Sequence, residues 1–102
     1  MINTAGSSVL AGAVGSAVTV VDATYQILST DDSVICNKAS AFTVTLPVAV
    51  VGTRFRIKNI GAGTVTVEGN SKDTIDGQLN QSLSQWESMD IQCYLANTWV
   101  IE

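Results

Sequence analysis

Few side chains in this sequence could carry out acid–base or nucleophilic chemistry. The chain has no histidine, the residue that most often serves as a general base or a metal ligand. Its closest carboxylates are Asp31 with Asp32, and Asp73 with Asp76. A carboxylate pair can hydrolyse a glycoside only in a cleft where burial raises the pKa of one member. Both pairs lie in polar segments typical of turns, so we predict turn-forming aspartates, no catalytic residues and no enzyme activity.

The sequence also lacks the residues that a metal site or a phosphate-binding site would need. Asp73 and Asp76 could give calcium a few oxygen ligands, but the sequence around them lacks the rest of the roughly six to eight that calcium takes. The segment Gly61-Ala-Gly63 is not followed by the lysine and hydroxyl residue of a phosphate-binding loop. We therefore expect no metal site and no cofactor.

Two cysteines, Cys36 and Cys93, lie among apolar residues in strand-like segments. We expect buried free thiols, because cysteine is among the residue types most often buried. A disulfide between them stays open, since the connectivity of cysteines cannot be derived from their positions in the chain alone.

Three aromatic residues, Trp86, Tyr94 and Trp99, could form a platform on which sugar rings stack. A structural role is the favoured interpretation, with Trp99 in the core and Trp86 at a subunit interface. The strand that precedes Trp86 carries uncharged polar side chains. We predict that an oligomer or ligand face is formed by Gln81, Gln85, Trp86 and Tyr94.

Charge is scarce for a chain of this length. Charged residues make up 14% of the 102 residues and hydrophobic residues 46%, against roughly 25% charged residues in an ordinary soluble domain. Surface covered by identical copies or by a larger body explains this composition; a neutral surface rich in Thr, Ser, Asn and Gln is the alternative. Five scattered basic residues and a net charge of −4 provide no basic patch for nucleic acid. No apolar run reaches the roughly 18 residues of a membrane span.

The elements that would position these residues are short strands. Apolar residues alternate with polar ones from residue 18 onward, and turn residues recur every few positions. The clearest pair is expected within residues 54–68, where two alternating segments flank Gly61-Ala-Gly63. We predict a hairpin there, with a bulge at Ile60, positive φ at the glycines, and Arg56 and Lys58 beside Thr66 and Glu68. Further strands are expected at residues 18–21, 25–28, 34–36, 42–46, 74–75, 79–86, 88–95 and 99–101.

These strands predict an all-β domain over residues 18–102, a compact antiparallel sandwich or jelly-roll-like barrel. Residues 1–17 are small, uncharged and rich in glycine, and each glycine would cost a helix about 1 kcal/mol. We predict an extended N-terminal arm there. Its anchoring side chains would be Ile2, Val9, Leu10 and Val14.

Five segments in order resemble a small β-rich module of tailed-bacteriophage virion proteins, found in tail fibres and in capsid-decorating proteins. They are Phe42-Thr-Val-Thr-Leu-Pro47, Gly52 with Arg56-Ile-Lys-Asn59, Thr64-Val-Thr-Val67, Asp73-Thr-Ile-Asp-Gly77 and Asn97-Thr-Trp-Val-Ile101. The resemblance covers residues 25–101. It implies a structural virion protein, usually a homotrimer, without catalytic residues.

The module of a fibre usually follows a long shaft, whereas here only the 17-residue arm precedes it. The expectation is therefore a capsid decoration, or cement, protein on the outer surface of the virion, bound to the major capsid protein and to copies of itself. A tail-fibre or receptor-binding module that contacts a host surface glycan or protein is the alternative. A separate sugar-binding domain is a third possibility.

Overall fold

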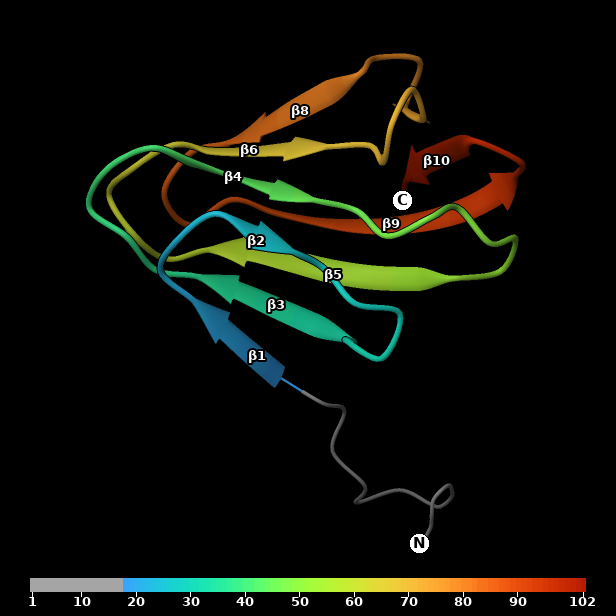
Figure 1. Ribbon diagram of the computed structural model, residues 1–102. Coiled ribbons are helices and arrows are strands. Elements are labelled where there is room, and N and C mark those ends of the chain that lie inside the picture. The colour runs from blue at the N-terminus through green and yellow to red at the C-terminus, as the bar shows by residue number, and fades with distance from the viewer. Residues whose placement is uncertain (1–17) are drawn as a thin grey trace, which may run out of the picture.

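The computed structural model describes residues 18–102, which form strands and turns and no helix (Figure 1). The arm side chains Ile2, Val9, Leu10 and Val14 lie outside these described residues. The all-β prediction is confirmed. The strands are β1 (Val18–Val21), β2 (Tyr25–Gln26), β3 (Ser33–Cys36), β4 (Phe42–Thr45), β5 (Arg54–Asn59), β6 (Val65–Glu68), β7 (Thr74–Ile75), β8 (Asn80–Leu83), β9 (Ser88–Leu95) and β10 (Thr98–Ile101).

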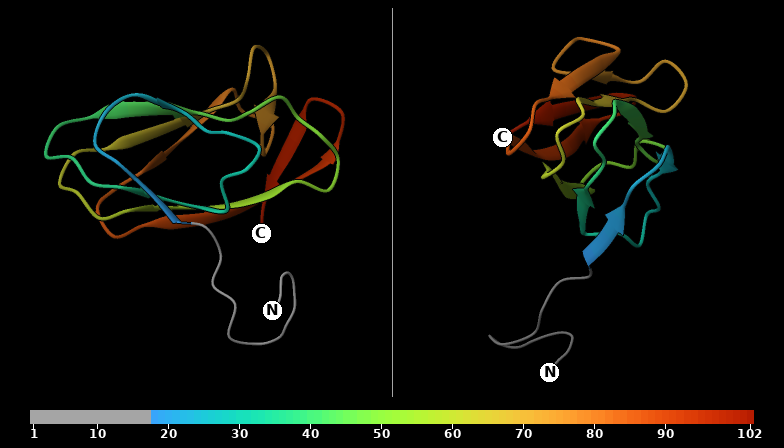
Figure 2. Two further views of the ribbon diagram at one scale, coloured as in Figure 1. Left: turned by 60° about the horizontal axis from the view of Figure 1, so that its bottom comes forward. Right: turned by 90° about the vertical axis from the view of Figure 1, so that its left-hand side faces the viewer.

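The strands form two sheets that face each other across one core. A six-stranded sheet has the order β1-β3-β5-β9-β10-β7, and a four-stranded sheet has the order β2-β4-β6-β8. From β1 to β6 the chain alternates between the sheets, so neighbours within each sheet are parallel. These turns of chain lie one beside the next in Figure 2. The winding is that of a short solenoid.

Two successive turns of this winding keep one register. Ser33 pairs with Arg56 and Phe42 pairs with Val65, a spacing of 23 residues in both sheets. The same spacing stacks Gly61 on Lys38 and Gly63 on Ser40. A Cβ atom on either glycine would overlap main-chain atoms of that partner, so glycine is required by the close approach of two backbones.

The expected hairpin of residues 54–68 is therefore wrong, although both of its strands are present. β5 and β6 lie in different sheets, so Arg56 and Lys58 do not pair with Thr66 and Glu68. The only register irregularity in the described pairs lies between Thr98 and Trp99, not at Ile60. Positive φ among the described glycines occurs at Gly52 and Gly77 rather than at Gly61 and Gly63.

Strand direction is mixed rather than antiparallel as expected. β9 runs antiparallel to β5 and to β10, and β8 runs antiparallel to β6. These three pairs end the parallel winding. The sandwich arrangement itself is present, because inward side chains of both sheets form a single core cluster.

The core is built as the alternation predicts. Phe42, Val44, Phe55 and Ile57 are all buried, and Trp99 is fully buried with its ring centroid 5.8 Å from that of Phe55. The cysteines Cys36 and Cys93 are buried and free, so the thiol prediction is confirmed. Burial raises the pKa of Cys36 to about 11, which keeps this thiol protonated at neutral pH.

Candidate interaction surfaces

The four residues of the predicted oligomer or ligand face do not lie together. Gln85 and Trp86 belong to the turn before β9, whereas Tyr94 lies near the end of this eight-residue strand. At roughly 3.3 Å per residue, Trp86 and Tyr94 are about 25 Å apart. Gln81 is partly buried on β8 and its side-chain amide donates to the carbonyl oxygen of Ile75. The predicted face is therefore divided between the two ends of β9 in the larger sheet and β8 in the smaller sheet.

Trp86 has an unusual combination of backbone and exposure. Its φ is 72°, a left-handed conformation that is a true outlier for a bulky residue. Its side chain is 63% exposed. The strain is therefore not explained by packing of the indole into the core. Strained residues of this kind persist only where surrounding contacts hold them, and they are found disproportionately at binding sites.

Hydrogen bonds from neighbouring strands hold the Trp86 turn, residues 84–87. The amide of Trp86 donates to the carbonyl oxygen of Asn59 at 2.5 Å. Lys58 Nζ donates to the carbonyl oxygen of Trp86 at 2.6 Å. Within the turn, Glu87 accepts from the amide of Ser84 through Oε1 at 2.7 Å and donates its own amide to the carbonyl of Ser84. The turn thus presents one aromatic ring on a fixed backbone.

Asn59 connects the Trp86 turn to the rest of the domain through hydrogen bonds. The side chain is fully buried. Its amide nitrogen donates to the carbonyl oxygens of Gly63 at 2.8 Å and Leu83 at 2.9 Å, and its side-chain oxygen accepts from the amide of Gly61 at 3.0 Å. Both side-chain N–H donors and the side-chain oxygen therefore take part in joining the β5–β6 connection to the end of β8.

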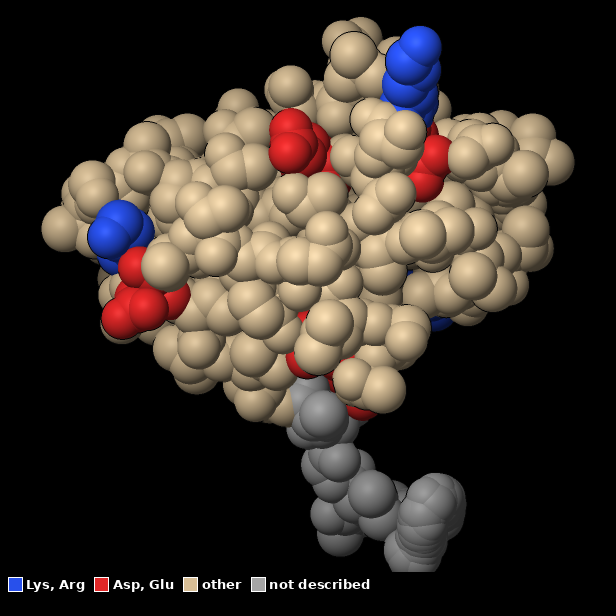
Figure 3. Space-filling model, in the orientation of Figure 1, with Lys and Arg blue, Asp and Glu red and all other residues tan. Residues whose placement is uncertain are grey.

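The opposite end of the strands carries exposed apolar side chains. β2 and β4 run toward this end, β3 and β5 start from it, and β9, antiparallel to β5, finishes there. Two chain connections and the last residues of β9 expose side chains at this end that are 53% to 68% accessible. We call these six residues the apolar end: Leu28, Val48, Val50, Val51, Tyr94 and Leu95. On the face shown in Figure 3, the right-hand end is covered almost entirely by uncharged residues.

The alternation of residues 88–95 predicts that Leu95 points into the core, together with Met89, Ile91 and Cys93. Those three are buried, but Leu95 is 56% exposed. β9 extends past the last layer of the core, so its inward side opens at the end of the sandwich. Tyr94 is the only member of the apolar end that belongs to the predicted face. The sequence does indicate three further members of the apolar end. Val48, Val50 and Val51 form an apolar run in a segment that is otherwise typical of a linker.

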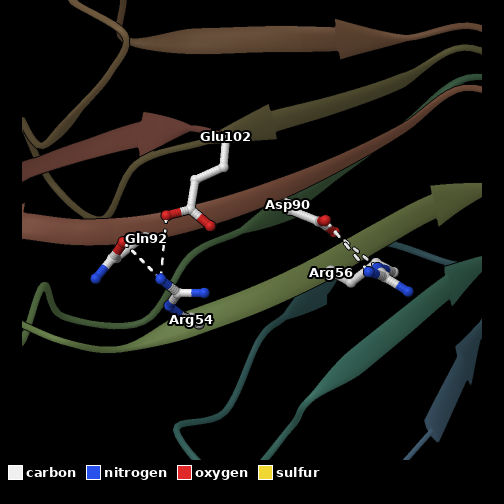
Figure 4. A network of polar contacts seen from close by, with 5 residues as sticks. All are labelled: Arg54, Arg56, Asp90, Gln92 and Glu102. Atoms are coloured by element: carbon white, nitrogen blue, oxygen red, sulfur yellow. Dashed lines mark hydrogen bonds and ion pairs between the residues drawn. The ribbon is translucent and has the colours of Figure 1, made fainter.

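The outer face of the larger sheet carries most of the paired charge (Figure 4). Arg56 donates to Asp90 through Nε at 2.7 Å and Nη2 at 3.2 Å. Arg54 Nη2 contacts Gln92 Oε1 at 3.2 Å and Glu102 Oε2 at 3.3 Å. The bond from Arg56 lowers the pKa of Asp90, and the bond to Asp90 raises the pKa of Arg56.

An open hollow of about 340 Å³ lies over these pairs. Its charged side chains are largely engaged with one another. The side chains of Arg54 and Arg56 connect β5 to β9 and to the C-terminal residue, Glu102. Exposed ion pairs of this kind contribute little to the stability of the fold. No group of three or more His, Cys, Asp or Glu side chains suited to a metal ion is found among residues 18–102.

The predicted turn aspartates do occupy turns. Asp31 is buried and accepts hydrogen bonds from Thr19 Oγ1 at 2.8 Å, from the Tyr25 hydroxyl at 2.7 Å and from the amide of Leu28 at 2.9 Å. Burial opposes ionisation, but these bonds outweigh it and lower the pKa of Asp31. Asp73 accepts from Asn97 Nδ2 at 2.7 Å, and Asp76 accepts from the amide of Ile101.

Within residues 18–102, β1 and β7 are the two edge strands of the larger sheet, and β1 is the strand that directly follows the arm in sequence. Val18 and Val20 face outward from it, 62% and 65% exposed. They pair in register with Ser33 and Ile35 of β3. Within residues 18–102, no helix long and apolar enough to cross a membrane is found.

No known family, curated protein or solved structure matches the chain.

Proposed function

We propose that this protein is a structural component of a bacteriophage virion that decorates the capsid as a cement protein. The observation that carries the proposal is the position of β1 at an edge of the larger sheet, where it has β3 as its one partner among residues 18–102. Its outward valines, Val18 and Val20, are exposed and the strand is continuous with the uncharged arm. An exposed, apolar edge strand is a ready template for a further strand. The ordered segments that resemble the phage module, and the low content of charge, also support the proposal.

Binding to the shell would occur by strand addition. A strand of the major capsid protein would pair with β1, and the arm would extend the contact through Ile2, Val9, Leu10 and Val14. Ordering the arm costs about 1–2 kcal/mol per residue, so hydrogen bonds and apolar contacts must offset that cost. A protein that binds only the assembled shell stabilises it by mass action. Homotrimers on the outer capsid surface would multiply this contact.

The alternative is a tail-fibre or receptor-binding module that contacts a host surface glycan or protein. Trp86 favours it, since the exposed indole lies among polar side chains on a fixed turn. An aromatic ring offers a flat apolar surface to a sugar ring at low entropic cost. In that case the protein would be present in few copies, at the tail.

Capsid binding by arm and edge variants tests the proposal. Purified shells that lack the protein are mixed with the full chain, with a variant lacking residues 2–16, and with Val20→Lys, and occupancy is measured by co-sedimentation. We expect the deletion to abolish binding and the lysine to weaken it at least tenfold. Trp86→Ala serves as the control and should bind as the full chain does.

Virion stability and location provide the second measurement. Particles without the protein should release their genomes at a lower temperature. Wild-type occupancy by the arm deletion would contradict the arm mechanism. Finding the protein in only a few copies, at the tail, would replace the cement role with the fibre role.

A further inference from the structure

Trp86 occupies a turn position at which glycine is usually found. The amide of Glu87 donates to the carbonyl oxygen of Ser84 at 3.0 Å, so residues 84–87 form a β-turn. Trp86, the third residue of this turn, has positive φ, whereas Gln85 does not. This is the pattern of a type II turn, whose third residue is normally glycine. The chain therefore carries a tryptophan where the backbone alone favours glycine.

Packing within the domain does not explain this tryptophan, because its side chain is 63% exposed. The backbone of the turn is held by bonds that require no particular side chain at position 86. The amide of Trp86 donates to the carbonyl oxygen of Asn59, and the amide of Asn59 donates to the carbonyl oxygen of Glu87 at 2.9 Å. A strained residue held in this way, with its side chain in solvent, points to a ligand outside the domain.

Polar side chains accompany the indole, and their charges cancel. Lys58 Nζ reaches the carbonyl oxygen of Trp86, Gln85 Nε2 donates to the carbonyl oxygen of Ile60 at 3.3 Å, and Glu87 Oε1 accepts within the turn. Each of the three side chains is thus anchored by one hydrogen bond. Gln85 Oε1, Glu87 Oε2 and two N–H groups of Lys58 have no further partner among residues 18–102. The turn therefore offers both donors and acceptors without net charge.

Among residues 18–102, no second exposed large hydrophobic residue adjoins the turn. Val20 is level with Ser88 in the larger sheet, but three strand spacings, about 14 Å, separate them. Leu79 lies four residues before Leu83, about 13 Å along the chain, and Tyr94 lies at the other end of β9. The core of a protein–protein interface gathers several apolar side chains. A single ring among polar groups suits a smaller and more polar ligand.

We propose that the Trp86 turn is a binding site for a neutral sugar residue of a glycan. The C–H groups on one face of a pyranose ring stack on the electron-rich face of an indole. The hydroxyl groups at the rim of the sugar both donate and accept, as do Lys58, Gln85 and Glu87 together. The absence of net charge favours a neutral sugar over a sialylated or sulfated one. The fixed backbone and anchored side chains lower the cost of ordering the site. This inference rests on the receptor-binding alternative of the proposed function and names its ligand class.

Indole N–H signals in ¹H–¹⁵N spectra test the inference directly. The chain has two tryptophans, Trp86 in solvent and Trp99 fully buried. The full chain is titrated with neutral trisaccharides ending in glucose, galactose, mannose or N-acetylglucosamine, and with sialyllactose and a sulfated disaccharide. We expect at least one neutral probe to shift the Trp86 signal and not the Trp99 signal. The Kd should be about 1 mM, because one stacked ring and a few hydrogen bonds form a small contact. Binding of the charged probes alone, or no shift up to about 20 mM, would overturn the inference.

Variants locate the site, with the backbone amide signals of Gln85 and Glu87 as the readout. Trp86→Ala should weaken binding about tenfold or more, and Trp86→Phe should keep part of it. Tyr94→Ala is the matched control, since Tyr94 is also an exposed aromatic residue, 55% accessible, and should bind as the full chain does. Unchanged binding by Trp86→Ala, or equal weakening by Tyr94→Ala, would contradict the proposed site.

Light scattering of the same proteins separates a sugar from a second copy as the partner of the indole. An oligomeric full chain that becomes monomeric on Trp86→Ala would show that a second copy covers the ring, and the sugar site would be overturned. A mass unchanged by Trp86→Ala, with sugar binding lost, supports the site. Capsid co-sedimentation decides the cement role separately, and a failure to bind sugars leaves that role standing.

Discussion

Trp86 has a strained backbone, and its side chain contributes little to the core. The free-energy cost of the strain can therefore be measured by replacing the residue, because little core packing is lost at the same time. Glycine adopts φ near 72° without steric cost, whereas a bulky residue there costs about 1–3 kcal/mol. Trp86→Gly should therefore raise the free energy of unfolding by about 1 kcal/mol. This figure is the strain that is relieved minus the extra conformational entropy that glycine loses on folding. Urea denaturation measures the change.

Tyr94→Gly is the control for that substitution. Tyr94 is also an exposed aromatic residue, but it lies in a regular strand, where glycine costs roughly 0.5–1 kcal/mol. We expect opposite signs for the two variants. A loss of stability in Trp86→Gly that equals the loss in Tyr94→Gly would mean that the indole supports the fold, and the argument for a presented ring would fail.

Asp31 should give the protein an acid-sensitive contribution to stability. Its pKa is lowered below the usual 3.8 in the folded state, so the unfolded chain takes up a proton first as the pH falls. The contribution is complete above pH 3.8 and is lost as the pH falls through the folded-state pKa. At pH 7, Asp31→Asn should lower the free energy of unfolding by about 1–3 kcal/mol.

Denaturation of wild type and variant as a function of pH measures this. The difference between them should shrink below pH 4. Asp22→Asn changes an exposed aspartate and should leave the curve nearly unchanged. If the difference in the free energy of unfolding between wild type and Asp31→Asn stays constant down to pH 2, the three hydrogen bonds to Asp31 do not depend on the negative charge of its carboxylate.

Among the elements, the strands were predictable from the sequence and their partners were not. Alternation places Phe55 and Ile57 inward whichever strand lies beside them, because a period of two carries no information on direction. Gly61-Ala-Gly63 has the composition of a hairpin turn, so β5 and β6 were expected to pair. The decisive feature is the stacking of these glycines on Lys38 and Ser40. This stacking depends on an offset of 23 residues between two successive turns, and the two turns have few identical residues at matching positions.

The interaction surfaces were predictable only in part. Exposed Trp86 and Tyr94 were identified by residue type, but nothing in the sequence indicates that one long strand separates them. The apolar end draws on the β2–β3 and β4–β5 connections and on the end of β9. Its members come together only through the winding, which sequence patterns do not specify.

Gly61→Ala tests the stacking of successive turns. The new methyl group would overlap main-chain atoms of Lys38, so the two turns must separate, at about 2–3 kcal/mol. Gly52→Ala is the contrasting variant. Its site is open but has φ of 94°, and it should lose only about 1 kcal/mol. Thermal denaturation of both variants measures the difference. Equal losses would mean that the backbone at Lys38 moves aside at little cost, and that close approach does not require glycine at position 61.

At the scale of the whole molecule, the two thiols report whether the domain unfolds as one unit. Cys36 lies on β3, in the parallel winding, and Cys93 lies on β9, in the antiparallel part; both are buried in the same core cluster. We expect both to react with an alkylating reagent at one common rate, set by global unfolding. Mass spectrometry of labelled peptides along a urea series measures the two rates.

Earlier labelling of Cys36 would show that the first turns open while β9 stays folded. Such a result would contradict a single cooperative unit over residues 18–102. Both thiols should also stay unlabelled in native buffer at pH 7, because both are buried. For Cys36 the raised pKa of about 11 lowers reactivity further, since thiolate is the reactive form.

The common register of β3–β4 and β5–β6 has a consequence for how such a chain could change in length. A tandem duplication of one 23-residue turn would insert between existing turns and leave β8 and β9 to close the sheets as before. The domain would lengthen by one strand spacing, about 4.8 Å. An insertion of an odd number of residues inside a strand would turn the inward side chains outward. Gene duplication can therefore vary the reach of this protein in discrete steps while the ends that contact other molecules stay the same.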